Sequence, residues 1–574
     1  MSRKSIALLF LNIFTIIINS LAEETDLRVC IPNLGCLQGT YLSGFQIEKF
    51  EAFMGIPYAK PPVGKLRLQN PEPFGSWENV MQATKPKPSC LQKNYFLETH
   101  PIMGVEDCLY LNLYRPQRST KLLPIIFYIH GGGFSFGSPH PDMLGPAYFM
   151  DTQEVILITF AYRLGPFGFL STGDEYMPGN FGLKDQNLAL KWVFDNAVYF
   201  SGDSNSITIF GHSIGGSSVQ FHMLSPASQG LFKRAIMMSG TAIAPFAATL
   251  KEPRLQANMI SAAVGITDSE QLSSEQLLNS LQNVDALTLL NASDVLKFWR
   301  HYNLINYRTV IEHSSWSNAF LVCEPDTLLK SGNVTQVPMM MGMVPSGGEG
   351  NIFAMRLLES EELRKEFNAN FENILTNIIE LPKEISNKDV KEKMNLIIDE
   401  YFQGKRELNN DTLKGFVELL GDISFLYPYY KTIEYYVKQS NIRQNPLYLY
   451  IFNYKGHYTY TTGYSSNTIT DIGVSHLDDM IYLFEAPDLF PNGFEKKSID
   501  AELVQEFTQL FVEFAKYGKS TAYNQVQECN GENFYKHDET GICNYLEYRN
   551  DGKKFKAVTQ QGFNVKRMKF WDNI

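Results

Sequence analysis

The stretch that decides the fold is Ser-Ile-Thr-Ile-Phe-Gly-His-Ser-Ile-Gly-Gly, residues 206–216. Its first part is apolar and β-branched, as in a buried strand, and residues 217–224 can continue as a helix. Ser213 stands at the junction, with Gly211 and Gly215 on either side. On so tight a turn, a Cβ atom at either glycine position would have no room. The pattern Gly-x-Ser-x-Gly in this context indicates a nucleophile elbow, although the five residues alone also occur in ordinary turns.

The chain around this turn alternates between apolar strands and segments with helical spacing. Residues 122–129 and 155–162 are continuous apolar runs, which are typical of strands buried on both faces of a mostly parallel sheet. Residues 183–200 precede the elbow strand and have helical spacing. This strand–helix–strand order predicts an α/β fold. Further apolar runs predict strands at residues 235–238, 337–341 and 447–452.

Helical and polar stretches follow the elbow. Residues 251–299 and 355–439 have this pattern, and we interpret them as insertions that cover one end of the sheet. Residues 27–60 predict an antiparallel opening, and residues 503–514 predict an amphipathic helix that Gly518 can end. The sequence contains no internal repeat, low-complexity tract or proline-rich linker. We therefore expect one domain over residues 23–574.

The composition indicates a globular chain with an acidic balance. Of its 574 residues, 44% are hydrophobic and 19% are charged, which suits a protein with a large core. The net charge is −11, and no long basic run occurs. A surface that binds nucleic acid or an anionic membrane needs clustered Lys and Arg, so the composition argues against both partners.

The first 22 residues have the three regions of a secretory signal peptide. A basic start precedes an apolar run at residues 6–18, and a small-x-small site ends at Ala22. We expect cleavage after Ala22 and secretion of the mature protein without a membrane anchor. The alternative is a signal anchor that stays in the bilayer, but the apolar run is short for that role.

The cysteines and the glycosylation sequons fit an oxidising, secretory route. Seven cysteines leave one unpaired, and pairing of near neighbours predicts Cys323 as the free thiol. Spacing alone does not fix the connectivity. The expected pairs are Cys30 with Cys36, Cys90 with Cys108, and Cys529 with Cys543. The sequons, which would be glycosylated if exposed, start at Asn291, Asn333 and Asn410.

A second glycine-rich turn follows the apolar run at residues 122–129. It reads His-Gly-Gly-Gly-Phe, residues 130–134. An ordinary loop and a phosphate cradle are alternatives, but the sequence has neither a Walker lysine nor the dinucleotide spacing here. Glycines let amide N–H groups approach the negative charge that develops on a substrate oxygen. Paired with the elbow, this turn predicts an oxyanion hole that includes Gly132 and Gly133.

With these two turns, the chain resembles the type-B carboxylesterase and cholinesterase family of α/β-hydrolases over most of its length. Further motifs carry the resemblance. They are Phe-Met-Gly-Ile-Pro-Tyr-Ala (53–59), Glu-Asp-Cys-Leu-Tyr-Leu-Asn (106–112), Tyr-Arg-Leu-Gly-Pro (162–166), Asn-Phe-Gly-Leu-Lys-Asp-Gln (180–186), Gly-Val-Ser-His-Leu-Asp-Asp-Met-Ile-Tyr-Leu-Phe (473–484) and Met-Lys-Phe-Trp-Asp (568–572). The last two are most similar to insect members. The resemblance implies a single α/β-hydrolase domain, a large mostly parallel sheet flanked by helices, and catalysis without a metal or cofactor.

The resemblance also selects the base and the acid that a serine nucleophile needs. The family motif falls on His476 as the base. The acid falls on Glu349, in a glycine-rich turn after the strand predicted at residues 337–341. The interval from Gly342 to Glu349 is longer than the family usually has, so this assignment departs from the pattern. Other downstream histidines, expected to be surface or packing residues, are His301, His313 and His457.

Both neighbours of Ser213 depart from the family pattern. His212 stands where cholinesterases have Glu. Juvenile-hormone esterases usually have Gln at this position, so His212 disfavours a juvenile-hormone esterase. We expect His212 to be structural. Ile214 stands where the family usually has Ala. Its amide N–H should complete the oxyanion hole, while its branched side chain is expected to crowd the floor of the site and to slow catalysis or restrict the acyl group.

Two positions bear on the substrate. Cholinesterases hold a quaternary ammonium through a Trp inside the loop that corresponds to Cys90–Cys108, and this chain has no Trp there. Acetylcholine is therefore not expected as a substrate. Phe246 corresponds to the Trp that narrows the family's acyl pocket, which implies a roomier pocket here.

These residues predict a secreted serine esterase that acts on a small-molecule ester through an acyl-enzyme. The alternative is a slow or non-catalytic member of the same fold that sequesters ligands or xenobiotics or serves in adhesion. The presence of all three triad candidates argues against that alternative. The sequence predicts neither the natural ester nor the oligomeric state.

Overall fold

The computed structural model describes residues 27–574 except 98, 118–120, 301, 381–386, 440–443, 462–472, 520–543, 553 and 562–564. The expected signal peptide and the expected pair of Cys529 with Cys543 lie outside the described residues.

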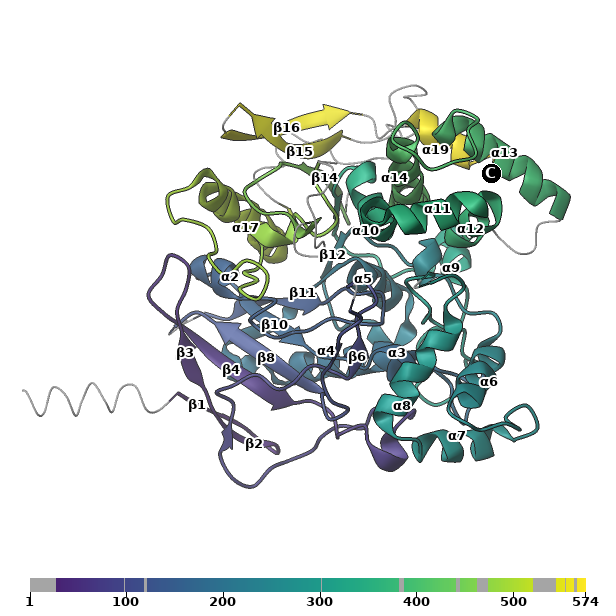
Figure 1. Cartoon of the computed structure of the whole chain (residues 1–574). Helices are drawn as coiled ribbons and strands as arrows, with labels where there is room; N and C mark the ends of the chain where they lie inside the picture. Colours follow the sequence, from purple (N-terminus) through teal and green to yellow (C-terminus); the bar gives the residue numbers. More distant parts are fainter. Residues whose placement is uncertain are drawn as a thin grey trace, which may run out of the picture.

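An 11-stranded sheet forms the centre of the fold (Figure 1). In spatial order its strands are β16 (Lys554–Gln561), β15 (Asn544–Asp551), β14 (Leu447–Asn453), β13 (Met339–Met343), β12 (Arg234–Met238), β11 (Gly202–His212), β9 (Leu123–Ile129), β10 (Ile156–Phe160), β8 (Tyr110–Arg115), β4 (Phe50–Pro57) and β3 (Thr40–Leu42). The strands from β15 to β10 pair in parallel, whereas β16 at one edge and β8, β4 and β3 at the other pair antiparallel. The sheet is therefore mixed, with the predicted parallel strands at its centre.

The predicted antiparallel opening is present. Strands β1 (Arg28–Ile31) and β2 (Gly35–Gln38) form a hairpin in which Cys30 lies opposite Cys36, and β2 also pairs with β5 (Met81–Gln82). A separate two-stranded sheet joins β6 (Gln92–Lys93) to β7 (Ile102–Met103).

Alternating side chains of the central strands supply two hydrophobic cores. In β11, Ile207 and Ile209 belong to the core that includes residues of α4 (Phe181–Asn196) and α5 (Ile214–Leu224). Phe210 belongs to the core that includes residues of α2 (Ala147–Asp151) and α17 (Ile499–Tyr517). Because each fully buried apolar side chain contributes about 1.5–3 kcal/mol, this alternation fixes which helices cover which face. Helix α17 ends at Gly518, which has a φ of 67°, as the sequence predicted.

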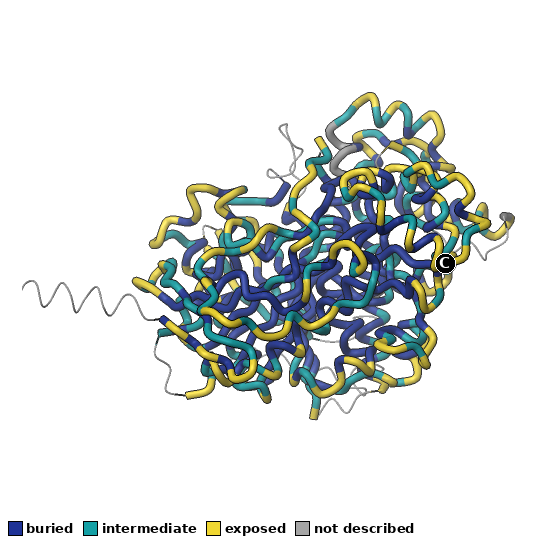
Figure 2. The backbone as a smooth tube through the Cα atoms, turned by 90° about the horizontal axis from the view of Figure 1, so that it is seen from below, coloured by how far each residue is buried: buried dark blue, intermediate teal, exposed yellow. Residues whose placement is uncertain are grey.

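Helices accumulate beside the sheet where the sequence predicted insertions (Figure 1). They are α6 (Pro253–Ala263), α7 (Ser274–Gln282), α8 (Ala286–Asn291), α10 (Ser346–Glu359), α11 (Glu361–Ala369), α12 (Phe371–Ile378), α13 (Asn387–Phe402), α14 (Leu413–Gly421) and α15 (Tyr427–Gln439). Shorter helices are α3 (Gly165–Phe169), α9 (Pro325–Ser331) and α19 (Val565–Trp571). Buried backbone fills the middle of the molecule and exposed segments surround it (Figure 2). Within the described ranges, no helix is long and apolar enough to cross a bilayer.

Candidate active site

Ser213 occupies a strained turn between β11 and α5. Its backbone has a φ of 58° and a ψ of −127°, a conformation that L residues rarely adopt. A Cβ atom on Gly211 would lie 2.2 Å from the Gly215 carbonyl oxygen, and one on Gly215 would lie 2.1 Å from the Ile129 carbonyl oxygen. The two glycines are therefore required for the close approach that the sequence predicted.

The other candidate residues follow the carboxyl ends of neighbouring parallel strands. His130 follows β9, Ser213 follows β11, and Ser239 follows β12. Glu349 comes shortly after β13, and His476 lies in a loop reached from β14. In an open parallel sheet, ligands bind at this carboxyl edge, because the loops that leave the strands meet there.

Glu349 and His476 are hydrogen-bonded to each other. His476 Nδ1 contacts Glu349 Oε2, and the two side chains are only 2% and 0% exposed. The other carboxylate oxygen, Glu349 Oε1, accepts hydrogen bonds from Ser239 Oγ at 2.6 Å and from the Val344 amide at 3.0 Å. These donors fix the orientation of the carboxylate toward the imidazole.

The backbone around Glu349 differs from the expected glycine-rich turn. Glu349 lies in the first turn of α10, which starts at Ser346 and so takes up the long interval after β13. The His476 amide donates to the Gly348 carbonyl oxygen at 3.0 Å. A Cβ atom on Gly348 would lie 1.8 Å from the Val474 carbonyl oxygen, so glycine at this position lets the loop of His476 pack against the start of the helix.

Ser213 and His476 line the same cavity, which encloses about 90 Å³. Within the part of the chain that the structure describes, no hydrogen bond joins their side chains; such bonds are often long in unliganded enzymes and tighten when substrate binds. The imidazole of His476 lies between two rings, with centroid distances of 4.6 Å to His212 and 5.0 Å to Phe425. The cavity walls are mostly apolar. Their aromatic members are Phe96, Tyr128, Phe136, Phe246, Phe353, Phe425 and Tyr460.

Three backbone amides could bind an oxyanion beside Ser213. Gly132 and Gly133 line the cavity, and Ile214 is the first residue of α5, whose N-terminus favours negative charge. Among the described residues, none of these three amides donates to a protein acceptor. His130 precedes the turn and stacks on Tyr162 at 4.3 Å. Burial lowers the pKa of His130 to about 4, so this imidazole brings no charge to the turn at neutral pH.

The side chain of Ile214 is not part of the cavity wall. It is 0% exposed and belongs to the main hydrophobic core. The expectation that it crowds the floor of the site is therefore wrong.

The sequence did not indicate a second buried pair, His212 and Asp479, behind His476. His212 Nε2 lies 3.7 Å from Asp479 Oδ1, and both side chains are 0% exposed. Burial lowers the pKa of His212 well below its ordinary value, and the charge of His476 adds to this. Burial and then the Glu349 carboxylate raise the pKa of Asp479 well above its ordinary value. Both shifts favour the neutral forms of the two side chains.

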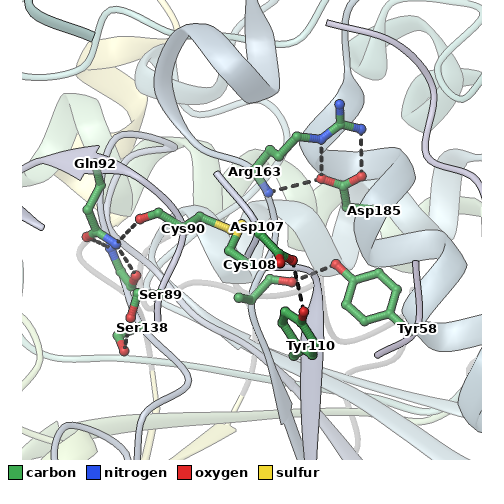
Figure 3. The surroundings of a disulfide bond; sticks show 12 residues. Tyr58, Ser89, Cys90, Gln92, Asp107, Cys108, Tyr110, Ser138, Arg163 and Asp185 are labelled. Atoms are coloured by element: carbon green, nitrogen blue, oxygen red, sulfur yellow. Dashed lines mark hydrogen bonds and ion pairs between the residues drawn. A yellow bond between two sulfur atoms is a disulfide. The ribbon is translucent and has the colours of Figure 1, made fainter. Parts of the chain in front are cut away.

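The predicted Cys90–Cys108 disulfide is present, and Gln92 and Ser138 lie near it (Figure 3). Gln92, two residues after Cys90, exchanges two hydrogen bonds of 2.8 Å with the backbone of Gly137, just beyond the glycine turn. Nearby, Arg163 holds Asp185 through two side-chain contacts (Figure 3). The predicted Cys30–Cys36 bond is also present, and Cys323 is a free thiol.

The remaining predicted positions are placed as follows. Phe246 lines the cavity and packs 5.2 Å from Phe425, centroid to centroid. His313 and His457 are exposed, and His301 lies outside the described residues. The sequon asparagines are all exposed: Asn291, Asn333 and Asn410.

The chain is similar to known proteins over most of its length. The sequence profile described as "Carboxylesterase family" matches residues 25–571. A juvenile hormone esterase from Tribolium castaneum is 37% identical over 537 residues, covering 91% of this chain and 89% of that protein. A carboxylic ester hydrolase from Bombus ignitus is 34% identical over 501 residues, covering 85% of each. The crystal structure of juvenile hormone esterase from Manduca sexta, with OTFP covalently attached, superposes with a TM-score of 0.79 at 26% identity, covering 95% of this chain and 99% of that one.

Proposed function

Because the chain belongs to the carboxylesterase family and is an ester hydrolase, we propose that it cleaves carboxylic esters through an acyl-enzyme on Ser213. The observation that carries this proposal is the hydrogen bond between Glu349 and His476, whose imidazole lines the same cavity as Ser213. The covalent adduct in the Manduca sexta enzyme fits nucleophilic chemistry in the same fold.

The reaction proceeds in two halves. His476 takes the hydroxyl proton of Ser213 while the serine oxygen attacks the ester carbonyl, and Glu349 stabilises the imidazolium that forms. The amides of Gly132, Gly133 and Ile214 bind the oxyanion, each contributing about 2.7–4 kcal/mol to lowering the barrier. His476 then returns the proton to the departing alcohol. Water repeats the same steps to release the acid.

The cavity favours an apolar acyl group. Its walls beside Ser213 are formed mainly by aromatic and aliphatic side chains, and Phe246 bounds the acyl side. Juvenile hormone is one candidate substrate, since two of the similar proteins are named juvenile hormone esterase. In contrast, His212 at the elbow favours a general carboxylesterase. A panel of aryl esters of increasing acyl length, with juvenile hormone included, separates these two possibilities.

We also propose that the mature protein is secreted after cleavage at Ala22. The N-terminal apolar run, two disulfides in the described residues and three exposed sequon asparagines support this route. N-terminal sequencing and glycosidase treatment of the protein recovered from culture medium test it. Retention of residues 1–22 in a cell-associated product would contradict the proposal.

The decisive experiment compares wild-type protein with Ser213→Ala and Glu349→Gln in hydrolysis of p-nitrophenyl butyrate. We expect kcat to fall by roughly 10³-fold or more in both variants, because each removes part of one triad. Ser138→Ala is the matched control, since Ser138 lines the same cavity but lies away from the elbow, and it should keep most of the activity. A folded wild type with neither turnover nor labelling by an organophosphate would overturn the mechanism.

A further inference from the structure

A second cavity lies beside the active site and shares no lining residue with it. It encloses about 250 Å³, between the segment from Ile481 to Phe494, α2 and the residues around Phe45. Aromatic rings form much of its wall. These rings belong to Phe45, Tyr148, Tyr458, Phe484, Phe490 and Phe494.

The rings are held in fixed arrangements. Phe45 meets Tyr148 edge to face at 5.1 Å. On another side, Tyr458 packs against Phe490 at 4.9 Å and Phe494 at 5.4 Å, and the Tyr458 hydroxyl donates to the Gly493 carbonyl oxygen at 2.9 Å. The faces of such rings are electron-rich and attract cations.

One carboxylate, Glu485, completes the wall. Among the described residues, no Lys, Arg or His forms an ion pair with it. Burial and the nearby Asp151 carboxylate raise the pKa of Glu485 to about 7, while the Ala147 amide partly stabilises the charged form. The Asp151 carboxylate is itself satisfied by the amides of Gln46 and Ile47. The cavity wall therefore contains a carboxyl group that lacks a cationic partner and is mostly ionised above about pH 7.

From this combination we propose that the cavity is a binding site for a small alkylammonium cation. Its methyl groups would pack on the ring faces while its charge neutralises Glu485. A metal ion fits less well, because the described residues contain no group of three acidic, histidine or cysteine side chains that could ligate one. A neutral guest would leave the Glu485 carboxylate with the Ala147 amide but without an opposite charge.

This site is physically connected to the active site. Phe490, in the wall of the second cavity, contacts Tyr460 edge to face at 5.5 Å, and Tyr460 lines the cavity of Ser213. Met480 lines the active-site cavity and the next residue, Ile481, lines the second one. Occupancy of the second cavity is therefore expected to alter turnover as well as to be measurable by itself.

The test uses choline and its neutral isostere, 3,3-dimethylbutan-1-ol, with binding measured by calorimetry on the Ser213→Ala protein. Choline should bind at least tenfold more tightly than the isostere. Glu485→Gln should remove that preference, because the amide keeps the shape without the charge. Phe490→Leu should weaken choline binding while the isostere changes little.

Asp488→Asn is the matched control, since Asp488 is an exposed carboxylate three residues along the same loop and outside the cavity wall. It should leave choline binding unchanged. The proposal would be overturned if choline and the isostere bound equally tightly. It would also be overturned if the Glu485 and Asp488 variants lost the same amount of choline affinity. Binding is measured without turnover, so failure of the proposed esterase mechanism would not affect the result.

Discussion

The backbone amide and the side chain of Ile214, the residue after Ser213, have different roles. Its amide belongs to the proposed oxyanion hole, whereas its side chain is fully buried in the main core. A substitution that keeps the backbone should therefore affect the folding free energy more than the reaction.

We expect Ile214→Ala to lower the free energy of unfolding by about 2–5 kcal/mol, because it removes buried methyl groups and leaves a cavity. The kcat for p-nitrophenyl butyrate should not rise. Urea unfolding and steady-state kinetics check the two parts. A faster enzyme of unchanged stability would restore the idea that Ile214 crowds the floor of the site.

At this scale the sequence predicted the residues that depend on local geometry. Ser213 and the glycine turn could be selected as candidates because the elbow and the turn impose their residue types within a few positions. Ser239 and Asp479 were not assigned roles, since their importance comes from contacts with Glu349 and His212, more than a hundred residues away in the chain. No local pattern distinguishes such a Ser or Asp from a surface residue.

The loop closed by Cys90 and Cys108 is bonded to the backbone just after the glycine turn. Its strand β6 carries Gln92, which holds Gly137 through two hydrogen bonds. The sequence separation between the cysteines is 18 residues.

Replacing both cysteines with serine should cost about 3 kcal/mol of stability, as expected for a loop of this length, and should also lower kcat because the glycine turn before Gly137 is less restrained. The matched control is the Cys30 and Cys36 double serine variant, whose loop spans six residues in the N-terminal hairpin. It should lose less stability and keep its kcat. Thermal unfolding and kinetics on both proteins test this, and equal kcat values would contradict the proposed support.

Elements with continuous apolar patterns were predictable, and elements with mixed patterns were not. The central strands β9 to β14 fall where the apolar runs are, but β11 begins at Gly202, five residues before its apolar part. Gly202 pairs with Leu123, and the polar residues from Asp203 to Ser206 lie in an irregular stretch before the pairing resumes at Ile207, so hydrophobicity does not mark this start. The two-residue strands β5, β6 and β7 carry no periodicity that could be read.

For the whole molecule, pH acts on stability through buried carboxyl groups. Glu485 changes its pKa from an ordinary 4.5 to about 7 on folding. Below about pH 4.5 the group is protonated in both states and has no effect. As pH rises toward 7, only the unfolded chain releases the proton, so stability falls and the loss is complete above pH 7.

Glu485→Gln should therefore raise the free energy of unfolding by about 1–3 kcal/mol relative to wild type at pH 8, and by almost nothing at pH 4. Thermal unfolding of both proteins across this range measures the difference. The same increment at both pH values would mean that the effect is one of packing and not of ionisation. Asp488→Asn should show no such pH dependence.

The order of the site residues along the chain bears on how the protein is made. The glycine turn begins at residue 130 and the imidazole is supplied by residue 476, after five strands of the sheet and most of the helices. Ribosomes add roughly 5–20 residues per second, so these 346 residues (476 − 130) take roughly 17–70 s to synthesise. From the synthesis of Ser213 until that of His476 the proposed nucleophile has no base, so the proposed mechanism does not allow a partly made chain to hydrolyse an ester before the sheet is nearly complete.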